Sequence, residues 1–182
     1  MYTKEEESIK LVVKAFENKK RIKEDINLAV HSITVGYMLK DIGCDENTVI
    51  SGFLHDIIED TDYDYNYLKE NYGEEIANNI LIVSEDVTIS DWHDRKIEFL
   101  KRFENSDINV LLIELADKLH NLVFDYNVYL KSGKEALATL NISYDMTKWY
   151  YLEFQKLFNK RIDKDNELLI RFNKICDIYF NE

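Results

Sequence analysis

Apolar side chains recur every three or four positions along most of the chain, which is the spacing of amphipathic helices. The first stripe covers residues 4–18, and the second covers 26–42 and stops at Gly43. Asp45, Asp64 and Asp91 each precede such a stretch and are predicted N-caps. Further helices are expected at about 45–58, 64–73, 73–84, 91–103, 107–126, 134–161 and 165–180. No segment alternates in the manner of a strand, so the predicted fold class is all-α.

The composition agrees with a helical domain. The chain has no proline and only five glycines, so few residues interrupt helices. Its 182 residues, 46% of them apolar, suit a single domain with a full core.

The net charge of −12 argues against a general binder of nucleic acid or of anionic membranes, because such surfaces repel an acidic protein. A small phosphorylated ligand remains compatible, since a bound cation and a few basic residues can reverse the potential inside one cleft. Cys44 and Cys176 are far apart, which points to a reducing compartment. No signal-like or membrane-spanning run is present, so we expect a cytoplasmic protein. The sequence does not fix the oligomeric state, and a homo-oligomer is possible.

One stretch, FLHDIIEDTD at 53–62, concentrates ionisable groups at the end of an otherwise apolar helix. On a continuous helix His55 and Glu59 lie one turn apart, and Asp56 and Asp60 form a second such pair. Half-buried polar groups of this kind are costly unless they bind a cation or are fully hydrogen-bonded. Imidazole with carboxylate is a suitable ligand set for Mn²⁺, Fe²⁺ or Zn²⁺.

Other helices must complete such a site. His31 lies in a helix that is otherwise patterned as core, and Asp117 lies among leucines in ELADKLHNL. Both are polar residues on segments that pack inward, where a ligand from a neighbouring helix has to be. An ion pair of Asp117 with Lys118 or Arg95 is the alternative for that carboxylate.

The order His31, His55-Asp56, Asp117 resembles the H…HD…D pattern of HD-domain metal phosphohydrolases. LHDIIEDT (54–61), YLKENYGEEIA (67–77) and LADKLHNL (115–122) further resemble the hydrolase domain of the RelA/SpoT-homologue superfamily, and the length is similar to the stand-alone small alarmone hydrolases. The resemblance implies an HD-domain helical bundle over 1–182, with a metal-site core at about 20–125 and C-terminal helices at about 134–180. It also implies removal of the 3′ pyrophosphate from ppGpp and pppGpp.

Site roles follow from this resemblance residue by residue. His31, His55, Asp56 and Asp117 match the family's ligands for one Mn²⁺, and Glu59 and Asp60 match the pair that activates water. The matches to substrate-contacting residues are Lys20, Arg21 and Asn121. Arg95 and Lys96 resemble an Arg-Lys of some members, although their pattern alone predicts surface residues. The segment NLAVHSI (27–33) lacks the family's proline and tyrosine around the first His, which leaves base recognition open, and Trp149 or Tyr150 could stack on a base.

Two other functions compete with alarmone hydrolysis. The same metal site could act on another nucleotide, such as a nucleoside monophosphate or NADPH. A non-catalytic regulatory module could also keep the fold, although it would not need Glu59 and Asp60. His93 and His120 belong to no constellation in the sequence.

Overall fold

The computed structural model describes residues 2–21, 25–133 and 143–180. In these ranges the secondary structure is helical apart from turns and one isolated backbone bridge between Lys20 and Asn27. The helices are α1 (Lys4–Ala15), α2 (Ala29–Asp41), α3 (Glu46–Leu54), α4 (Ile57–Asp60), α5 (Tyr65–Tyr72), α6 (Glu74–Val83), α7 (Trp92–Arg102), α8 (Ile108–Ser132), α9 (Tyr144–Arg161) and α10 (Glu167–Phe180). The prediction of an all-α helical bundle is confirmed for the described residues. None of these helices combines the length and the apolar character needed to cross a membrane.

The predicted helix starts are confirmed by their side-chain caps. The carboxylates of Asp45, Asp64 and Asp91 accept the backbone N–H of the residue three positions on, at 2.9, 2.8 and 2.9 Å. Each bond satisfies an amide that has no partner inside the helix.

Two predicted helices have different bounds. The prediction of one helix over 45–58 is wrong, because α3 ends at Leu54 and α4 begins at Ile57. Asp56 lies between them with φ −85° and ψ −1°, at the edge of the right-handed helical region. The helix expected at 107–126 continues to Ser132, and the segment 134–142 of the helix expected at 134–161 lies outside the described residues.

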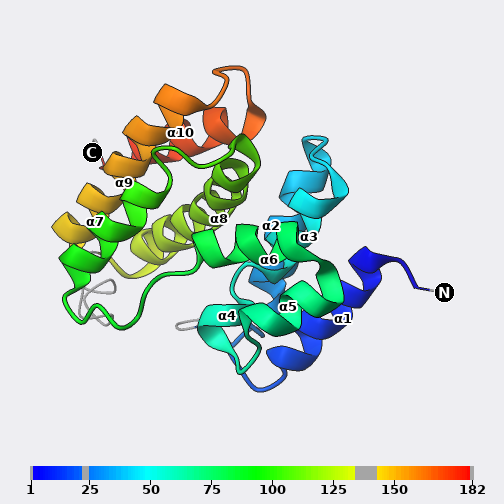
Figure 1. The fold of residues 1–182 in the computed structure, drawn as a ribbon. Coiled ribbons are helices and arrows are strands. Elements are labelled where there is room, and N and C mark those ends of the chain that lie inside the picture. Colours follow the sequence, from blue (N-terminus) through cyan, green and yellow to red (C-terminus); the bar gives the residue numbers. More distant parts are fainter. Residues whose placement is uncertain (1, 22–24, 134–142, 181–182) are drawn as a thin grey trace.

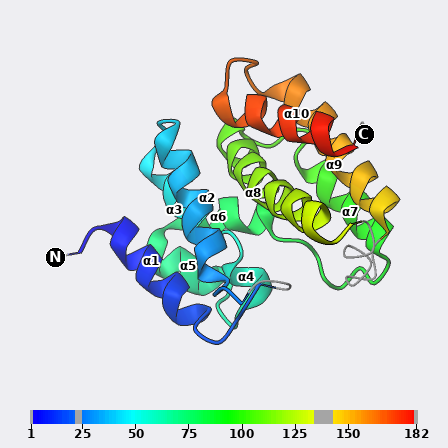
Figure 2. The same cartoon turned by 180° about the vertical axis from the view of Figure 1, so that it is seen from behind.

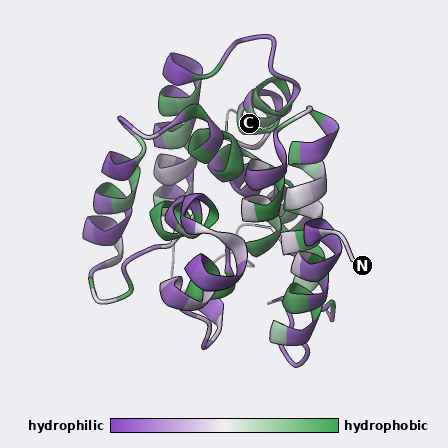
Figure 3. Cartoon of the chain, turned by 45° about the vertical axis from the view of Figure 1, so that its right-hand side comes forward, coloured by the Kyte–Doolittle hydropathy of each residue, from purple (hydrophilic) through white to green (hydrophobic). Residues whose placement is uncertain are grey.

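The helices enclose two hydrophobic cores (Figures 1 and 2). The first lies where α8, α9, α10 and α7 meet α2 and α3, and it is rich in aromatic residues. The second lies between α1, α3, α5 and α6. In Figure 3 most helices carry both hydrophobic and hydrophilic residues, as expected of amphipathic helices. Helices α2 and α3 contribute buried residues to both cores, so they form the boundary between them.

Glycines let α2 and α3 approach closely at this boundary. A Cβ at Gly36 would overlap the Phe53 ring, and a Cβ at Gly52 would overlap the Leu39 side chain. Both glycines therefore shorten the distance between the two helices that carry His31 and His55.

Candidate metal centre

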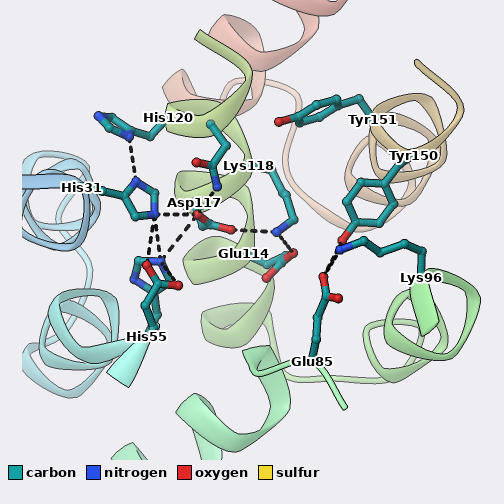
Figure 4. A network of polar contacts seen from close by, with 12 residues as sticks. His31, His55, Glu85, Lys96, Glu114, Asp117, Lys118, His120, Tyr150 and Tyr151 are labelled. Carbon is teal, nitrogen blue, oxygen red and sulfur yellow. Dashed lines mark hydrogen bonds and ion pairs between the residues drawn. The ribbon is translucent and has the colours of Figure 1, made fainter. Parts of the chain in front are cut away.

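Three buried side chains meet between α2, α3 and α8. His31 projects from the first turn of α2, His55 caps the C-terminal end of α3, and Asp117 lies in the middle of α8. They are 4%, 3% and 6% exposed. One ligand atom from each lies within 4.8 Å of the others, as required for a shared ion (Figure 4).

The ring nitrogens of the two histidines are directed by their surroundings. His55 Nδ1 donates to the Gly52 carbonyl at 2.9 Å, so its Nε2 is left to face the cluster. His31 Nε2 lies 3.1 Å from His55 Nε2 and 3.0 Å from Asp117 Oδ1. Two ring nitrogens and a carboxylate oxygen thus converge on one point.

Asp56 adds a second carboxylate at the edge of this cluster. Its Oδ1 lies 3.0 Å from His55 Nε2, and its Oδ2 lies 3.4 Å from His31 Nε2. The break between α3 and α4 falls at His55 and Asp56, the two adjacent residues that both reach the cluster.

Neighbours on α8 hold the Asp117 carboxylate in place. Lys118 Nζ donates to Asp117 Oδ2 at 2.7 Å and lies 3.0 Å from Glu114 Oε1. The Asn121 amide donates to Asp117 Oδ1 at 2.6 Å. The predicted pairing of Asp117 with Lys118 therefore occurs together with its place in the cluster, whereas Arg95 pairs with Glu85 instead.

The electrostatics of the cluster favour a cation. Burial opposes charge on both His55 and Asp117, but their mutual attraction outweighs it. Asp56 and Asp117 raise the pKa of His55 well above its usual value, and Lys118 and the imidazoles hold the pKa of Asp117 well below its own. A divalent ion supplies the same positive charge in place of those protons, so the donor set fits a metal.

Glu59 and Asp60 stand beside the cluster on the short helix α4. Burial, with the nearby carboxylates of Asp56 and Glu85, raises the pKa of Glu59 to about 8. The Lys118 charge and the Glu85 backbone oppose this rise. Burial and Asp56 also raise the pKa of Asp60, and the Lys19 charge opposes this shift. Water still reaches the Glu59 side chain, which is exposed within its cavity.

A cavity of about 610 Å³ opens onto the cluster. This volume suits a nucleotide-sized ligand. Its wall carries the predicted metal and water-activating residues together with basic side chains, which are Lys19, Lys20, Arg21, Lys96 and Lys118. A second cavity of about 570 Å³ is lined by α1 residues and by 59–63, and it shares Lys19, Glu59 and Asp60 with the first.

The family model for the HD domain matches residues 8–139. The chain belongs to the HD domain family. An HD domain implies divalent-metal binding, and the His31–His55–Asp117 group provides the ligand atoms for it.

Curated relatives of this HD domain carry names from alarmone metabolism. A "Probable guanosine-3′,5′-bis(diphosphate) 3′-pyrophosphohydrolase" of Synechocystis sp. (strain ATCC 27184 / PCC 6803 / Kazusa) is 34% identical over 97 residues, which are 50% of this chain and 13% of that protein. The corresponding hydrolase of Spiroplasma citri is 30% identical over 137 residues, or 67% of this chain and 18% of that protein. The HD-domain chain therefore spans less than a fifth of the length of these relatives.

Two solved structures share the fold over nearly the whole HD-domain chain. A protein described as a metazoan ortholog of SpoT that hydrolyzes ppGpp aligns with a TM-score of 0.77 at 21% identity, covering 96% of this chain and 94% of its own. A protein of Listeria monocytogenes EGD-e aligns with a TM-score of 0.76 at 23% identity, covering 84% and 99%.

The predicted substrate-contacting residues of the HD domain all line the cavity, but in different ways. Arg21 donates to Asn121 Oδ1 at 2.6 Å, and its guanidinium lies 3.9 Å from the centre of the Phe124 ring. Lys20 is largely exposed and pairs with Asp25. The roles of these residues in substrate binding stay a prediction.

The cavity wall also contains Glu85, which the sequence did not single out, beside Lys96 and Tyr150. Glu85 pairs with both Arg95 and Lys96, and it lies within 3.5 Å of the Tyr150 hydroxyl (Figure 4). Lys96 lies over the Tyr150 ring, 4.7 Å from its centre. Lys96 is only 14% exposed, so the expectation of a surface residue is wrong for it. Trp149 packs on Trp92 and is not among the residues that line the cavity.

His120 also belongs to the HD-domain site, although the sequence gave no reason to select it. Its Nδ1 lies 2.8 Å from His31 Nδ1 and 3.2 Å from an Arg21 nitrogen. Burial, followed by His31 and Arg21, lowers the pKa of His120 to about 4. A neutral His120 can therefore accept a hydrogen bond from His31, which leaves His31 Nε2 for the cluster. The sequence could have indicated His120, because it follows Asp117 by three residues and therefore lies almost one helical turn away on the same side of the helix.

Proposed function

We propose that this protein is a metal-dependent hydrolase that removes the 3′-diphosphate of guanosine alarmones, converting ppGpp or pppGpp to GDP or GTP and pyrophosphate. The observation that carries the proposal is the buried His31–His55–Asp117 group, which opens onto a nucleotide-sized cavity beside two carboxylates with raised pKa. The names of the curated relatives support the choice of substrate.

We assign the metal to His31, His55, Asp56 and Asp117, and we propose Mn²⁺ as the ion. These two imidazoles and two carboxylates would hold the ion, because mixed nitrogen and oxygen donors suit ions of this class. A bound divalent ion lowers the pKa of its water and neutralises charge on the phosphoryl group. Lys118 and Asn121 keep Asp117 oriented toward that ion.

Glu59 is the proposed general base. A carboxylate whose pKa lies near neutrality is well matched to accept a proton from water. Asp60, the next residue, orients the same water. Attacking and leaving oxygens lie roughly in line in phosphoryl transfer. Glu59 and Asp60 line both cavities, so water can reach them from the second cavity while the nucleoside lies along α8 in the first.

The substrate's other charges meet the basic side chains of the cavity. Arg21, Lys20 and Asn121 are the proposed contacts, and Arg21 is already oriented by Asn121 and His120. These cations supply donors that an acidic protein would otherwise lack.

We further propose a cytoplasmic location. Cys44 and Cys176 are free thiols, which suits a reducing compartment.

The decisive experiment incubates the purified protein with ppGpp and Mn²⁺ and measures pyrophosphate, with a chelator control. Pyrophosphate release that the chelator abolishes supports the proposal. Orthophosphate from a nucleoside monophosphate or from NADPH would instead favour another nucleotide substrate. Uptake of Mn²⁺ without turnover of any nucleotide would indicate a non-catalytic module.

Glu59→Gln tests the assignment of the base. The amide cannot accept the proton, so turnover should fall by roughly 10²–10⁴-fold while Mn²⁺ uptake persists. Glu75→Gln, at an exposed residue of α6 that lines neither cavity, is the matched control. A fully active Glu59→Gln protein would remove Glu59 from the mechanism.

A further inference from the structure

The large cavity continues beyond the metal centre along α8. This helix contributes Asp117, then Asn121, and then Phe124 and Asp125 to the same wall. Because a helix rises about 1.5 Å per residue, Asp125 lies about 12 Å along the axis from Asp117. A nucleoside whose 3′-phosphate is at the metal centre and whose body follows this wall has its base near Asp125.

Tyr151 on α9 fixes the Asp125 carboxylate. The buried Tyr151 hydroxyl donates to Asp125 Oδ2 at 3.0 Å, and both residues line the cavity. Burial and the neighbouring Asp125 raise the pKa of Tyr151 well above its usual value, so the phenol stays protonated and remains a donor. The carboxylate is therefore oriented before a ligand arrives.

Arg21 and Phe124 form a flat boundary in the same region. The guanidinium lies 3.9 Å from the centre of the Phe124 ring, and Asn121 holds its edge. A planar group beside this boundary would direct its edge along the wall that contains Asp125.

The chemistry of a fixed carboxylate separates the purine bases. Guanine presents N1–H and the 2-amino group as adjacent donors, and the two oxygens of a carboxylate can accept from both. Adenine presents an acceptor at N1, which a carboxylate repels. Hypoxanthine keeps N1–H and lacks the amino group.

We infer that Asp125, oriented by Tyr151, reads the base edge and makes this protein selective for guanine nucleotides. The inference rests on the proposed function, because it assumes that a nucleotide occupies the cavity with its phosphates at the metal. It identifies the specificity-determining residue of the base site.

Asp125→Asn provides a test with a gain as well as a loss. The asparagine amide offers one acceptor and one donor, which complements the N1–H and 2-oxo groups of xanthine. We would titrate the Mn²⁺-loaded protein with GDP, IDP, XDP and ADP by calorimetry. The wild type should bind GDP roughly 10–100-fold more tightly than ADP, with IDP between them. In Asp125→Asn, GDP should weaken by a similar factor and XDP should become the preferred ligand.

Two further variants distinguish base reading from a plain cross-link between α8 and α9. Tyr151→Phe removes the hydroxyl that donates to the carboxylate, so the GDP-to-ADP affinity ratio should fall without a preference for XDP. Asp177→Asn, at an exposed residue of α10 that does not line the cavity, should change no ratio. If Asp125→Asn fails to fold, the Tyr151→Phe ratio decides the question.

An unchanged order of GDP, IDP, XDP and ADP in Asp125→Asn would overturn the inference, as would a wild type that binds GDP and ADP equally. Pyrophosphate release from ppGpp is measured separately. A protein that selects GDP but releases no pyrophosphate refutes the proposed activity and retains the base-reading role. A protein that hydrolyses ppGpp but binds all four diphosphates equally supports the proposed activity and refutes the base-reading role of Asp125.

Discussion

Replacing Lys118 by methionine removes the positive charge closest to the metal-binding carboxylate of α8. The Lys118 ammonium lies 2.7 Å from Asp117 Oδ2 and 3.0 Å from Glu114 Oε1. The three side chains are 11%, 9% and 2% exposed, so water can replace little of the lost interaction. Methionine keeps most of the aliphatic stem and leaves two carboxylates without their cation.

The expected cost of Lys118→Met follows from this geometry. Breaking a buried ion pair on one side costs roughly 3–5 kcal/mol, because an uncompensated charge remains. For a chain of this length, each kcal/mol lowers the melting temperature by roughly 2–4 °C. We therefore expect the metal-free variant to melt about 6–20 °C below the metal-free wild type.

Thermal unfolding in chelator, followed by circular dichroism, measures this loss. The matched control is Lys69→Met, which removes an equally close pair with Glu74 whose side chains are 46% and 63% exposed. Such a surface pair contributes only about 0–1 kcal/mol. Glu114→Gln added to Lys118→Met should recover part of the loss, because one orphaned carboxylate disappears.

Equal effects of Lys118→Met and Lys69→Met would refute the reasoning. Such a result would mean that water or a rearranged side chain compensates Asp117 and Glu114, so the centre would not be dry. A recovery on adding Mn²⁺ that is larger in Lys118→Met than in the wild type would support it, since the ion supplies the missing charge to Asp117.

Three further outcomes are expected. The pKa of Glu59 is about 8 in the folded protein against 4.5 ordinarily, so between these pH values the folded protein keeps a proton that the unfolded chain loses, and this group lowers stability as pH rises. In chelator, Glu59→Gln should therefore flatten the fall in melting temperature from pH 5 to 8. An unchanged slope would contradict the shift. Gly36→Ala places a methyl group where the Phe53 ring lies, which should lower the free energy of unfolding in urea by about 1–3 kcal/mol and weaken Mn²⁺ binding. Wild-type values for both quantities would show that α2 and α3 can move apart without cost. Chelation should lower the melting temperature of the wild type but not of His55→Ala, and an equal response of both would exclude His55 as a ligand.

Local sequence signals predicted most of the helical framework. Asp45, Asp64 and Asp91 were recognisable as caps because an N-cap depends on the residue itself and on an amide three positions later. The break after Leu54 was not predictable in this way. It occurs where His55 and Asp56 both reach toward α2 and α8, so its position depends on tertiary contacts that a helical periodicity does not contain.

The same distinction applies to the candidate site. Ordered motifs indicated His31, His55, Asp56 and Asp117, and the structure brings all four together. His120 was missed and Lys96 was wrongly expected at the surface, since their positions depend on neighbours that are distant in the sequence or reached only through packing. His120 meets His31 across 89 positions, and Lys96 meets Glu85 through the packing of α7.

The candidate metal centre lies between the two hydrophobic cores, so metal binding would affect how firmly the cores are held together. Asp117 belongs to the α8 half, whereas His31 and His55 come from the boundary helices that pack against both halves. An ion bound by all three residues would cross-link α8 to the boundary helices α2 and α3, and its binding free energy would stabilise the contact between the two cores. The metal-free protein should then be loosest at α2 and α3, so proteolysis and amide hydrogen exchange should be fastest at that boundary.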